Sequence, residues 1–295
     1  MSELPRVHLI DGTYELFRAH YSKRPSHRSP NGRELKATVG LASSLLALLH
    51  DDAEKVTHCA VAFDNPIRSF RNDLFDGYKS DEGVPPELRS QFDDAEEAVR
   101  ALGIVVWSMD RYEADDALAT GAARFGSRAR VRILSPDKDL CQCLWGDQVV
   151  AVDRRRQKEI TEQTVWADWG VDPKSIPDLL ALVGDAADGI PGLKGFGLKG
   201  AALLLQKFQR LEAIPDDPSS WGVAVRGSAV LAETLRAHRD EALLYRELAT
   251  LKTDVPLKED LPALSWRGVP RLQFESWCDR LAVKSLKARP ARWVG

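Results

Sequence analysis

Short apolar runs alternate with longer segments of helical pattern along the first half of the chain. The runs that predict β-strands cover residues 6–10, 57–63, 103–107, 130–134 and 148–152. The segments that predict helices lie at residues 35–49, from the Pro85–Pro86 pair to about Ala101, and at 113–125. Because strands and helices alternate, we expect an α/β fold with a mostly parallel sheet and helices on both faces.

The pattern changes after about residue 175 and becomes mostly helical. A helix is predicted at residues 176–183, and the glycines that follow it predict tight turns before a second helix at residues 201–208; these glycines are Gly192, Gly195, Gly197 and Gly200. A glycine hairpin that enters a helix exposes backbone N–H groups, which suit a DNA phosphate and read no base sequence. We therefore expect two domains, residues 1–175 and residues 176–295.

Carboxylates stand where several predicted elements end. Asp11, Asp64 and Asp137 each follow an apolar run. In parallel sheets the carboxyl ends of the strands form the ligand-binding edge. Crowded carboxylates repel one another, and divalent cations with a preference for oxygen, such as Mg²⁺ or Mn²⁺, relieve that repulsion. Metal-assisted phosphate chemistry is therefore the first hypothesis, with these candidate ligands: Asp11, Asp64, Glu113, Asp115, Asp116, Asp137, Asp139, Asp185 and Asp188.

Composition excludes other classes of protein. The 295 residues are 44% hydrophobic and 29% charged, which is typical of globular proteins. No apolar run approaches the ~20 residues of a membrane span. Residues 1–6 lack the pattern of a signal peptide, and the four cysteines, which have no zinc-binding spacing, are expected to be reduced packing residues of a cytosolic protein. We expect a cytoplasmic protein, associated with the nucleoid if bacterial. The net charge of −3 gives no global sign of nucleic-acid binding, yet Lys and Arg residues flank the acidic segments.

Six short motifs occur in one order between about residues 6 and 210, and together they resemble the 5′ nuclease (flap endonuclease) family. The likeness is strongest to the 5′-nuclease domain of bacterial DNA polymerase I and its stand-alone relatives. The motifs are Leu9-Ile-Asp-Gly12, Phe63-Asp64, Phe70-Arg71 with Tyr78-Lys79, Tyr112-Glu-Ala-Asp-Asp-Ala117, Ser135-Pro-Asp-Lys-Asp139, and Gly184-Asp185-x-x-Asp188 with Ile190-Pro-Gly192 and Gly195-x-Gly197-x-Lys199.

The resemblance implies a PIN-like three-layer α/β/α core, a helical arch at about residues 68–102, and a helix-three-turn-helix region. It places one metal among Asp64, Glu113, Asp115, Asp116 and Asp137 with Asp11 nearby, and a second near Asp137, Asp139, Asp185 and Asp188. It implies that Lys79 and Arg71 contact the scissile phosphate. The residues that it assigns to DNA binding are Arg18, Tyr21, Gly192, Lys194, Gly195, Gly197 and Lys199.

The implied activity is structure-selective hydrolysis of DNA at 5′ flaps or 5′ ends by a two-metal mechanism. The implied protein is a monomer whose partner is DNA, with Mg²⁺ or Mn²⁺ as cofactor and K⁺ at the glycine hairpin. No polymerase domain fits into 295 residues, so we expect a stand-alone protein. Two other hypotheses stay open: a branched-DNA-binding protein of the same fold without catalysis, and an RNA-directed PIN ribonuclease or a phosphatase.

Two departures from the family pattern have consequences. Residues 80–83 are Ser-Asp-Glu-Gly, and the helix that follows carries Asp93, Asp94, Glu96 and Glu97. An arch with these acids is less basic than the family pattern, which predicts poorer threading of a free 5′ end. In the hairpin, Gly189, Leu198 and Gly200 replace the residues usual in the family, and the added glycines loosen the backbone that a K⁺ ion needs.

Overall fold

The computed structural model describes residues 4–295, and the chain forms two compact units. Unit 1 contains the chain up to Ser69, Asp81–Ser135 and Thr253–Gly295, and unit 2 contains Phe70–Ser80 and Pro136–Lys252. Residues 1–3, which belong to the segment without a signal-peptide pattern, lie outside the described residues. The units differ from the expected division at residue 175 because the chain enters each unit more than once.

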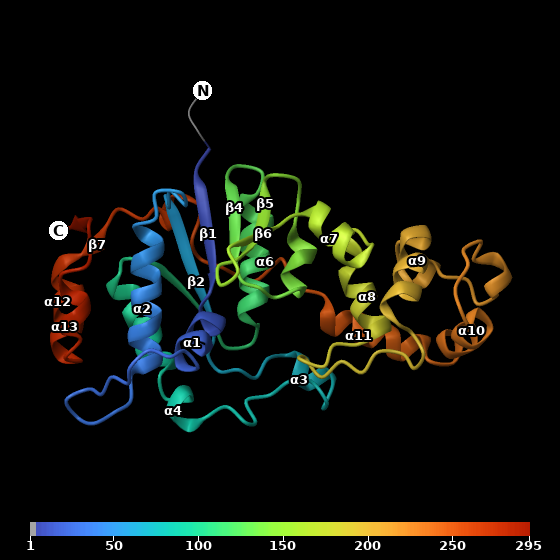
Figure 1. The fold of residues 1–295 in the computed structure, drawn as a ribbon, viewed down its shortest axis with the longest axis horizontal. Helices are drawn as coiled ribbons and strands as arrows, with labels where there is room; N and C mark the ends of the chain where they lie inside the picture. Colours follow the sequence, from blue (N-terminus) through green and yellow to red (C-terminus); the bar gives the residue numbers. More distant parts are fainter. Residues whose placement is uncertain (1–3) are drawn as a thin grey trace. The chain divides into compact units, whose positions relative to one another are not determined.

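Four parallel strands form the centre of unit 1, in the spatial order β3-β2-β1-β4. Figure 1 shows β2, β1 and β4 side by side. The strands are β1 (Arg6–Asp11), β2 (His58–Asp64), β3 (Val105–Met109) and β4 (Arg130–Leu134). Apolar side chains that are almost completely buried fill β1 and β2, as expected for inner strands covered on both faces. The predicted parallel sheet is therefore confirmed, and the carboxyl ends of its strands share one edge.

Helices cover both faces of this sheet. Helix α6 (Ala114–Phe125) packs across all four strands. Helix α5 (Phe92–Ala101) packs on β2 and β3 and on α2 (Lys36–Leu49). Helix α2 in turn packs on α1 (Gly12–His20), which contacts β2 (Figure 1). The three-layer α/β/α arrangement predicted for the core is confirmed.

Helix α1 was not expected from the hydrophobic pattern. It begins directly after Asp11, whose carboxylate accepts a hydrogen bond from the backbone N–H of Tyr14 at 2.8 Å and so caps the helix. Gly12 makes this abrupt start possible, because a Cβ atom there would lie 2.6 Å from Val61 Cγ1 and 2.7 Å from the carbonyl oxygen of Ala62. The chain therefore turns from β1 into α1 at the edge where the strands end.

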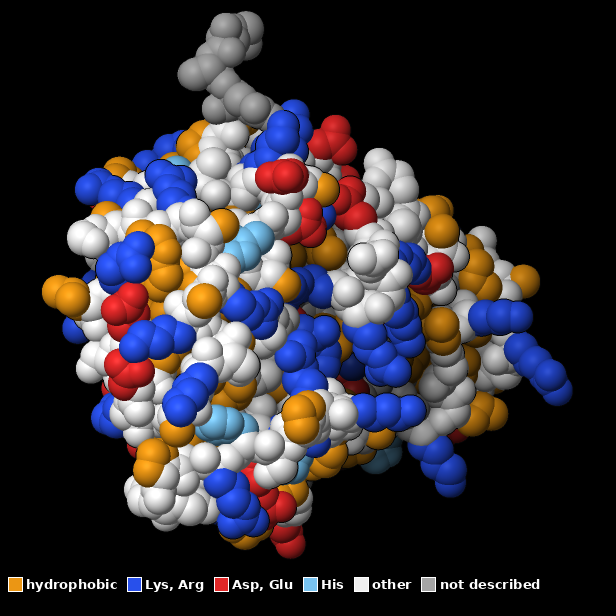
Figure 2. All heavy atoms as spheres, turned by 60° about the vertical axis from the view of Figure 1, so that its left-hand side comes forward, with side chains coloured by type: hydrophobic (Ala, Val, Ile, Leu, Met, Phe, Trp, Pro, Cys, Tyr) orange, Lys and Arg blue, Asp and Glu red, His pale blue; other side chains and the backbone are white. Residues whose placement is uncertain are grey.

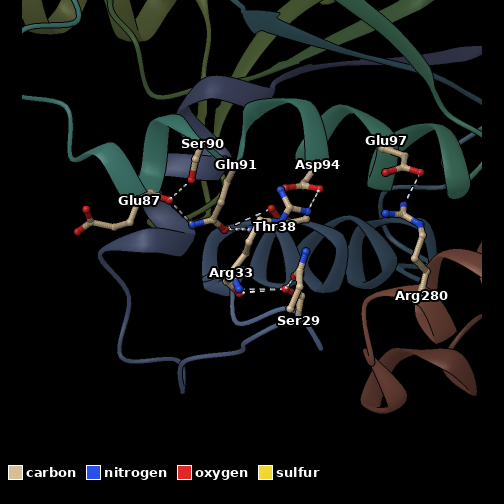
Figure 3. Close-up of polar contacts among 10 residues, drawn as sticks. Ser29, Arg33, Thr38, Glu87, Ser90, Gln91, Asp94, Glu97 and Arg280 are labelled. Atoms are coloured by element: carbon tan, nitrogen blue, oxygen red, sulfur yellow. Dashed lines mark hydrogen bonds and ion pairs between the residues drawn. The ribbon is translucent and has the colours of Figure 1, made fainter.

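The helix predicted from Pro85 to Ala101 is in fact two helices. Helix α4 covers Pro86–Arg89, and α5 starts only at Phe92. The interruption is stabilised by Gln91, whose buried side chain accepts hydrogen bonds from the backbone N–H and the hydroxyl of Thr38 at 3.1 and 3.3 Å (Figure 3). A contact with a residue 53 positions away cannot be inferred from local periodicity.

The acidic side chains of α5 are paired inside unit 1 (Figure 3). Asp94 receives two hydrogen bonds from the guanidinium of Arg33, at 2.8 and 2.9 Å, and Glu97 pairs with Arg280 at 2.5 Å. Glu96 is buried and accepts hydrogen bonds from Ser108 and Arg100. The carboxylates of Asp94 and Glu96 are thus buried and paired within unit 1, so these two acids add little negative charge to the surface of the predicted arch.

The C-terminal part of unit 1 adds short elements beside α5. They are η5 (Pro262–Leu264), β7 (Val269–Pro270), α12 (Arg271–Arg280), α13 (Lys284–Lys287) and β8 (Trp293–Val294). Strands β7 and β8 form a small parallel pair, and α12 packs on α5. This segment returns to unit 1 after the chain has passed through unit 2.

Unit 2 is mainly helical. It contains α3 (Arg71–Leu74), η1 (Asp139–Cys143), the antiparallel pair β5 (Val149–Asp153) and β6 (Lys158–Ile160), α7 (Glu162–Trp169), η2 (Pro173–Ser175), α8 (Ile176–Val183), α9 (Leu198–Phe208), η3 (Leu211–Ala213), η4 (Pro218–Ser220), α10 (Ser228–Ala237) and α11 (Arg239–Ala249). Helix α8 packs along α11 and against α9. None of the helices in residues 4–295 is long and apolar enough to cross a membrane.

Two of the four predicted turn glycines behave as expected. Gly192 and Gly195 adopt φ angles of 70° and 92°, in the left-handed region that favours glycine. Gly197 is the N-cap residue of α9 with an extended backbone. The prediction for Gly200 is wrong, because α9 begins at Leu198 and Gly200 lies in its first turn.

At the amino end of β1, a buried histidine connects a carboxylate and a guanidinium. His8 is fully buried, and its Nε2 lies 2.9 Å from Glu54, which also accepts a hydrogen bond from Arg132 Nε at 2.8 Å. The hydrogen bond to His8 is the largest cause that lowers the pKa of Glu54, to about 2, with Arg132 contributing in the same direction. This network lies at the opposite end of β1 from Asp11 and stabilises the sheet.

Replacement of Glu54 by Gln should lower the free energy of unfolding at pH 7 by about 1–2 kcal/mol, because a partly exposed ion pair and its hydrogen bonds are lost. The folded-state pKa is depressed, so the stabilisation is present above about pH 4.5 and is lost as the pH falls towards 2. Urea unfolding at pH 7 and pH 3 measures both values. A difference between the wild type and the variant that stays constant or grows towards pH 3 would contradict this assignment.

Candidate active site

The carboxylates of unit 1 gather at the edge where its strands end. Asp11 closes β1 and is 7% exposed, and Asp64 closes β2. The hydroxyl of Ser135, directly after β4, donates a hydrogen bond to Asp11 Oδ2 at 2.9 Å. The backbone N–H of Asp64 donates to the hydroxyl of Thr13 at 2.9 Å, which links the end of β2 to the start of α1. Because β1 and β2 are parallel neighbours, Asp11 and Asp64 lie at the same edge of the sheet.

The amino end of α6 adds the second part of this group. Glu113 is the N-cap residue, and its backbone N–H donates to Asp116 Oδ2 at 3.0 Å in a capping box. Asp64 Oδ1 accepts a hydrogen bond from the backbone N–H of Ala114 at 2.7 Å. Asp115 lies in the same first turn, half-buried. The positive end of the helix dipole therefore stabilises several carboxylates at once.

Unit 2 holds the other group of predicted ligands. One carboxylate oxygen from each of Asp139, Asp185 and Asp188 lies within 4.8 Å of the others, a spacing that fits coordination of one cation. Burial, followed by the nearby charge of Asp137, raises the pKa of Asp139 well above its ordinary value. Burial also raises the pKa of Asp137, with the charge of Asp188 acting in the same direction. These carboxylates therefore sit where a bound cation lowers their energy.

The donor set fits a hard divalent cation. All the candidate ligands are carboxylates, which is the chemistry that Mg²⁺ and Mn²⁺ prefer. Asp139 Oδ1 is buried and receives no hydrogen bond from the described residues. A buried oxygen of this kind costs free energy unless a cation or donor reaches it. Asp139, Asp185 and Asp188 are therefore the residues of unit 2 best placed to hold the ion.

Two lysines balance part of this negative charge. Lys79 Nζ lies 2.9 Å from Asp188 Oδ1, and the backbone N–H of Lys79 donates to the carbonyl oxygen of Asp188 at 3.0 Å. Lys138 Nζ contacts Asp185 Oδ2 and lies 3.5 Å from Asp139 Oδ1. Burial alone would lower the pKa of Lys138, but the carboxylates of Asp139 and Asp185 outweigh it and raise that pKa. Sequence reasoning assigned no role to Lys138, although it stands between two predicted ligands.

The segment that carries Lys79 is held against the hairpin of unit 2. A Cβ atom at Gly189, where φ is 74°, would lie 2.1 Å from the carbonyl oxygen of Gly77, so only glycine allows this approach. The side chain of Asn72 donates to the carbonyl oxygen of Lys79 at 2.8 Å and closes the loop from the other side. Gly189, which departs from the family pattern, therefore has a structural reason in this chain.

Arg71 takes a different position from Lys79. Its side chain is completely buried, and its guanidinium donates hydrogen bonds to the carbonyl oxygens of Leu248 at 2.7 Å and Thr250 at 2.9 Å. These carbonyls lie at the carboxyl end of α11, where helix carbonyls lack intrahelical partners. The contact with a scissile phosphate that the resemblance implies therefore has no support from this geometry; Arg71 connects α3 with α11.

The predicted DNA-binding residues of the hairpin present an open surface. Lys194 and Lys199 are exposed, and the turn between them is fixed by the buried side chains of Leu193 and Phe196. Asp185 and Ile190 exchange backbone hydrogen bonds of 2.7 and 2.8 Å at the base of the hairpin. Asp185 therefore belongs both to the carboxylate group and to the frame of the hairpin.

Of the predicted DNA contacts in unit 1, Tyr21 is 67% exposed, whereas Arg18 is half-buried and donates to Ser44 Oγ at 2.8 Å as well as to Glu15.

Next to Ser44, sequence reasoning missed two arginines that converge on one neutral residue. Arg24 and Arg289 both donate to the hydroxyl of Ser43, at 3.1 and 2.6 Å. Their separation of 265 positions gave no sequence signal.

We call Arg24, Lys36 and Arg289 the Ser43 patch. Lys36 Nζ donates to the carbonyl oxygen of Ser22 at 2.7 Å, and the hydroxyl of Ser22 accepts a hydrogen bond from the backbone N–H of Arg24. No carboxylate in residues 4–295 forms an ion pair with any of the three cations. Figure 2, which turns the side of α2 and α12 forward, shows Lys and Arg side chains gathered across that face. Cations without acidic partners favour binding of an anion.

Comparison with known proteins identifies both parts of the chain. The 5′-3′ exonuclease N-terminal resolvase-like domain matches residues 6–170, and the 5′-3′ exonuclease C-terminal SAM fold matches residues 171–271. A DNA polymerase I from Rhizobium leguminosarum is 37% identical over 271 residues, which are 90% of this chain and 26% of that protein. The chain thus spans about a quarter of the length of this relative.

Two solved structures show the same fold. A bacteriophage T5 5′-exonuclease with bound zinc superposes with a TM-score of 0.65 at 17% identity, covering 94% of this chain and 98% of the other. A bacteriophage T5 flap endonuclease, described as a pseudo-enzyme–product complex with DNA and metal ions, superposes with a TM-score of 0.62 at 19% identity, covering 94% and 99%. At these identities the likeness concerns the fold.

Replacement of Arg71 by Met should lower the free energy of unfolding by about 2–4 kcal/mol, because two carbonyls at the end of α11 lose their donor in a buried place. Urea unfolding measures the change, and Arg236→Met, at an exposed position of α10 in the same unit, is the control with little expected effect. Wild-type stability in Arg71→Met together with loss of phosphodiester cleavage would instead support direct contact with substrate.

Proposed function

Because the chain belongs to the 5′-3′ exonuclease family, we propose that it is a divalent-metal-dependent nuclease that hydrolyses DNA phosphodiesters at 5′ flaps or 5′ ends. The observation that carries the proposal is the convergence of Asp139, Asp185 and Asp188 beside Lys79, within the same unit as the glycine hairpin. A carboxylate group of this kind is suited to a cation, and the hairpin is suited to a phosphate backbone.

The proposal assigns a role to each group of residues. Asp11, Asp64, Glu113, Asp115 and Asp116 are proposed to hold one ion, and Asp137, Asp139, Asp185 and Asp188 a second. When bound, Mg²⁺ or Mn²⁺ supplies an activated water and stabilises charge on the leaving oxygen. Lys79 is proposed to contact the scissile phosphate and to stabilise the charge that develops there, because its ammonium stands at the carboxylate group and is partly exposed.

Binding of DNA is proposed to use the hairpin residues and the exposed side chain of Tyr21. Gly192, Lys194, Gly195, Gly197 and Lys199 present backbone N–H groups and two ammonium groups at the start of α9, which suits contacts to phosphate without reading bases. We further propose that K⁺ binds at the hairpin and that the protein acts as a monomer. The T5 flap endonuclease complex, whose fold this chain shares, contains DNA and metal ions and supports DNA as the substrate class.

A branched-DNA-binding protein without catalysis is a weaker alternative, because every carboxylate that the resemblance requires is present. An RNA-directed ribonuclease is also weaker, since the glycine hairpin is unnecessary for it. Incubation of the purified protein with Mg²⁺ and a 5′-flap duplex, a linear duplex or an RNA strand separates the three hypotheses. Cleavage of RNA alone would favour the ribonuclease, and binding of flap DNA without cleavage under any metal would favour the binding protein.

Replacement of Asp137 by Ala should lower the rate of flap cleavage by about 10²-fold or more, because a half-buried carboxylate of the proposed metal group is removed. Binding of the same DNA in Ca²⁺ should change little, since the hairpin and the Ser43 patch are untouched. Single-turnover cleavage and fluorescence anisotropy measure the two quantities. Turnover at the wild-type rate would refute the assignment of Asp137.

Replacement of both Arg24 and Arg289 by Ala should weaken binding of duplex DNA about 10-fold or more at low salt. If each arginine contacts one phosphate, the slope of log K against log salt should become shallower by about 1.8. Arg24 and Lys36 come after α1, which is 9 residues or about 13 Å long and starts after Asp11. A duplex held at the strand ends can therefore reach them and Arg289, which shares the hydroxyl of Ser43 with Arg24.

The matched control for the Ser43 patch is a variant with Arg130 and Arg267 replaced by Ala. Both side chains are exposed in unit 1, and the change in net charge is identical. Anisotropy titrations at roughly 50 to 200 mM salt compare the DNA affinities of the two variants, because the dependence of affinity on salt is measurable in that range. Equal losses of affinity in both would show that net charge, and not the Ser43 patch, is responsible.

A further inference from the structure

Lys138 occupies a place in the carboxylate group that the proposed function does not explain. Its Nζ contacts Asp185 Oδ2 and lies 3.5 Å from Asp139 Oδ1, so one ammonium faces two of the three carboxylates that are positioned to share a cation. Lys79 serves the third carboxylate, Asp188. The two lysines therefore differ in position. Lys79 belongs to the segment that follows α3, whereas Lys138 lies in the sequence between the proposed ligands Asp137 and Asp139.

The backbone fixes Lys138 at this place. The N–H of Asp139 donates to Asp137 Oδ1 at 2.8 Å, and the N–H of Cys141 donates to the carbonyl oxygen of Lys138 at 3.0 Å at the start of η1. The side chain of Gln142 donates to the carbonyl oxygen of Asp139 at 2.8 Å. With the backbone held on both sides, the ammonium changes position only by rotation of its own side chain.

Asp185 is similarly constrained. Its Oδ1 accepts a hydrogen bond from the N–H of Ala187 at 3.0 Å, and its backbone pairs with Ile190 in both directions. Oδ2 is then the oxygen that faces Lys138. A divalent cation that binds Asp185 Oδ2 and Asp139 Oδ1 has to displace the ammonium from these oxygens, because both cations require the same negative charge.

We propose that Lys138 is a built-in counter-ion of the carboxylate group of unit 2. Its ammonium neutralises Asp139 and Asp185 in the metal-free protein and competes with a divalent cation for them, so that the cation binds weakly until substrate phosphate adds further oxygen ligands. This inference rests on the proposed function, since it takes the carboxylate group as a metal site. Mg²⁺ is commonly held by one or two carboxylates together with substrate phosphate, which is the behaviour that such competition favours.

The test is a calorimetric titration of the full chain with Mn²⁺ in the absence of DNA. Replacement of Lys138 by Met should tighten binding of Mn²⁺ on the order of tenfold, because the repulsion between ammonium and divalent cation is removed. Lys138→Arg retains the charge and should stay within about threefold of the wild type. Lys158→Met is the control, since Lys158 pairs with Asp168 elsewhere in unit 2 and should leave Mn²⁺ affinity unchanged.

Thermal unfolding gives a second readout that does not depend on calorimetry. Without its counter-ion, the Lys138→Met variant should melt below the wild type in EDTA and gain more in melting temperature from Mn²⁺ than the wild type gains. Lys138→Gln serves the same purpose if the Met variant fails to fold. Unchanged or weaker binding of Mn²⁺ in the neutral variants would overturn the proposal.

The outcomes also separate this proposal from the proposed function. Tighter binding of Mn²⁺ in Lys138→Met without cleavage of DNA by the wild type would uphold the counter-ion and contradict the nuclease. Cleavage by the wild type with equal Mn²⁺ affinity in all variants would contradict the counter-ion alone. Absence of Mn²⁺ binding in the wild type and in both neutral variants would contradict both.

Discussion

Repulsion between buried carboxylates is the constraint on which the arrangement of this chain depends, and its two units meet the constraint in different ways. In unit 1, backbone and hydroxyl donors stabilise the acids: Tyr14 N–H and Ser135 hold Asp11, and Ala114 N–H holds Asp64. Helix starts supply these N–H groups, so the carboxylates have hydrogen bonds whether or not a cation is present.

In unit 2, backbone N–H groups donate to Asp137 and Asp185, and the ammonium groups of lysine side chains supply the remaining positive charge. Asp139 Oδ1 receives no hydrogen bond from the described residues, and the ammonium groups of Lys138 and Lys79 supply positive charge instead. An ammonium on a flexible side chain can be replaced by a cation, whereas a backbone N–H at a helix start stays in place. The carboxylates of unit 2 are therefore the more sensitive of the two groups to the supply of metal ions.

Much of the fold, and the position of Asp11 and Asp64 at the edge of the sheet, followed from the sequence. Apolar runs located β1, β2 and β4 within a residue or so, and the acids at their ends marked the edge of the sheet correctly. The features that were not predicted depend on contacts between distant residues. Helix α1 can start at Gly12 only because this residue is glycine, since a side chain there would collide with Val61, and the break before α5 depends on the hydrogen bond between Gln91 and Thr38. Local periodicity contains no information about such partners. The role of Arg71 escaped for the same reason, since motif and spacing do not show whether a guanidinium faces solvent or the carbonyls of α11.

Net charge is a poor guide to the binding of DNA by this chain, and the structure explains why. The total of −3 counts acids such as Asp94 and Glu96, which are buried and paired with arginines and so contribute little field at the surface. The total also counts the carboxylates of the proposed metal groups, and bound cations would offset the charge of these carboxylates. Arg24 and Arg289 enter the same total with opposite sign, yet they share only the neutral hydroxyl of Ser43 and keep their charge available. A polyanion responds to the charges that are left without partners, and on the face around Ser43 those charges are positive.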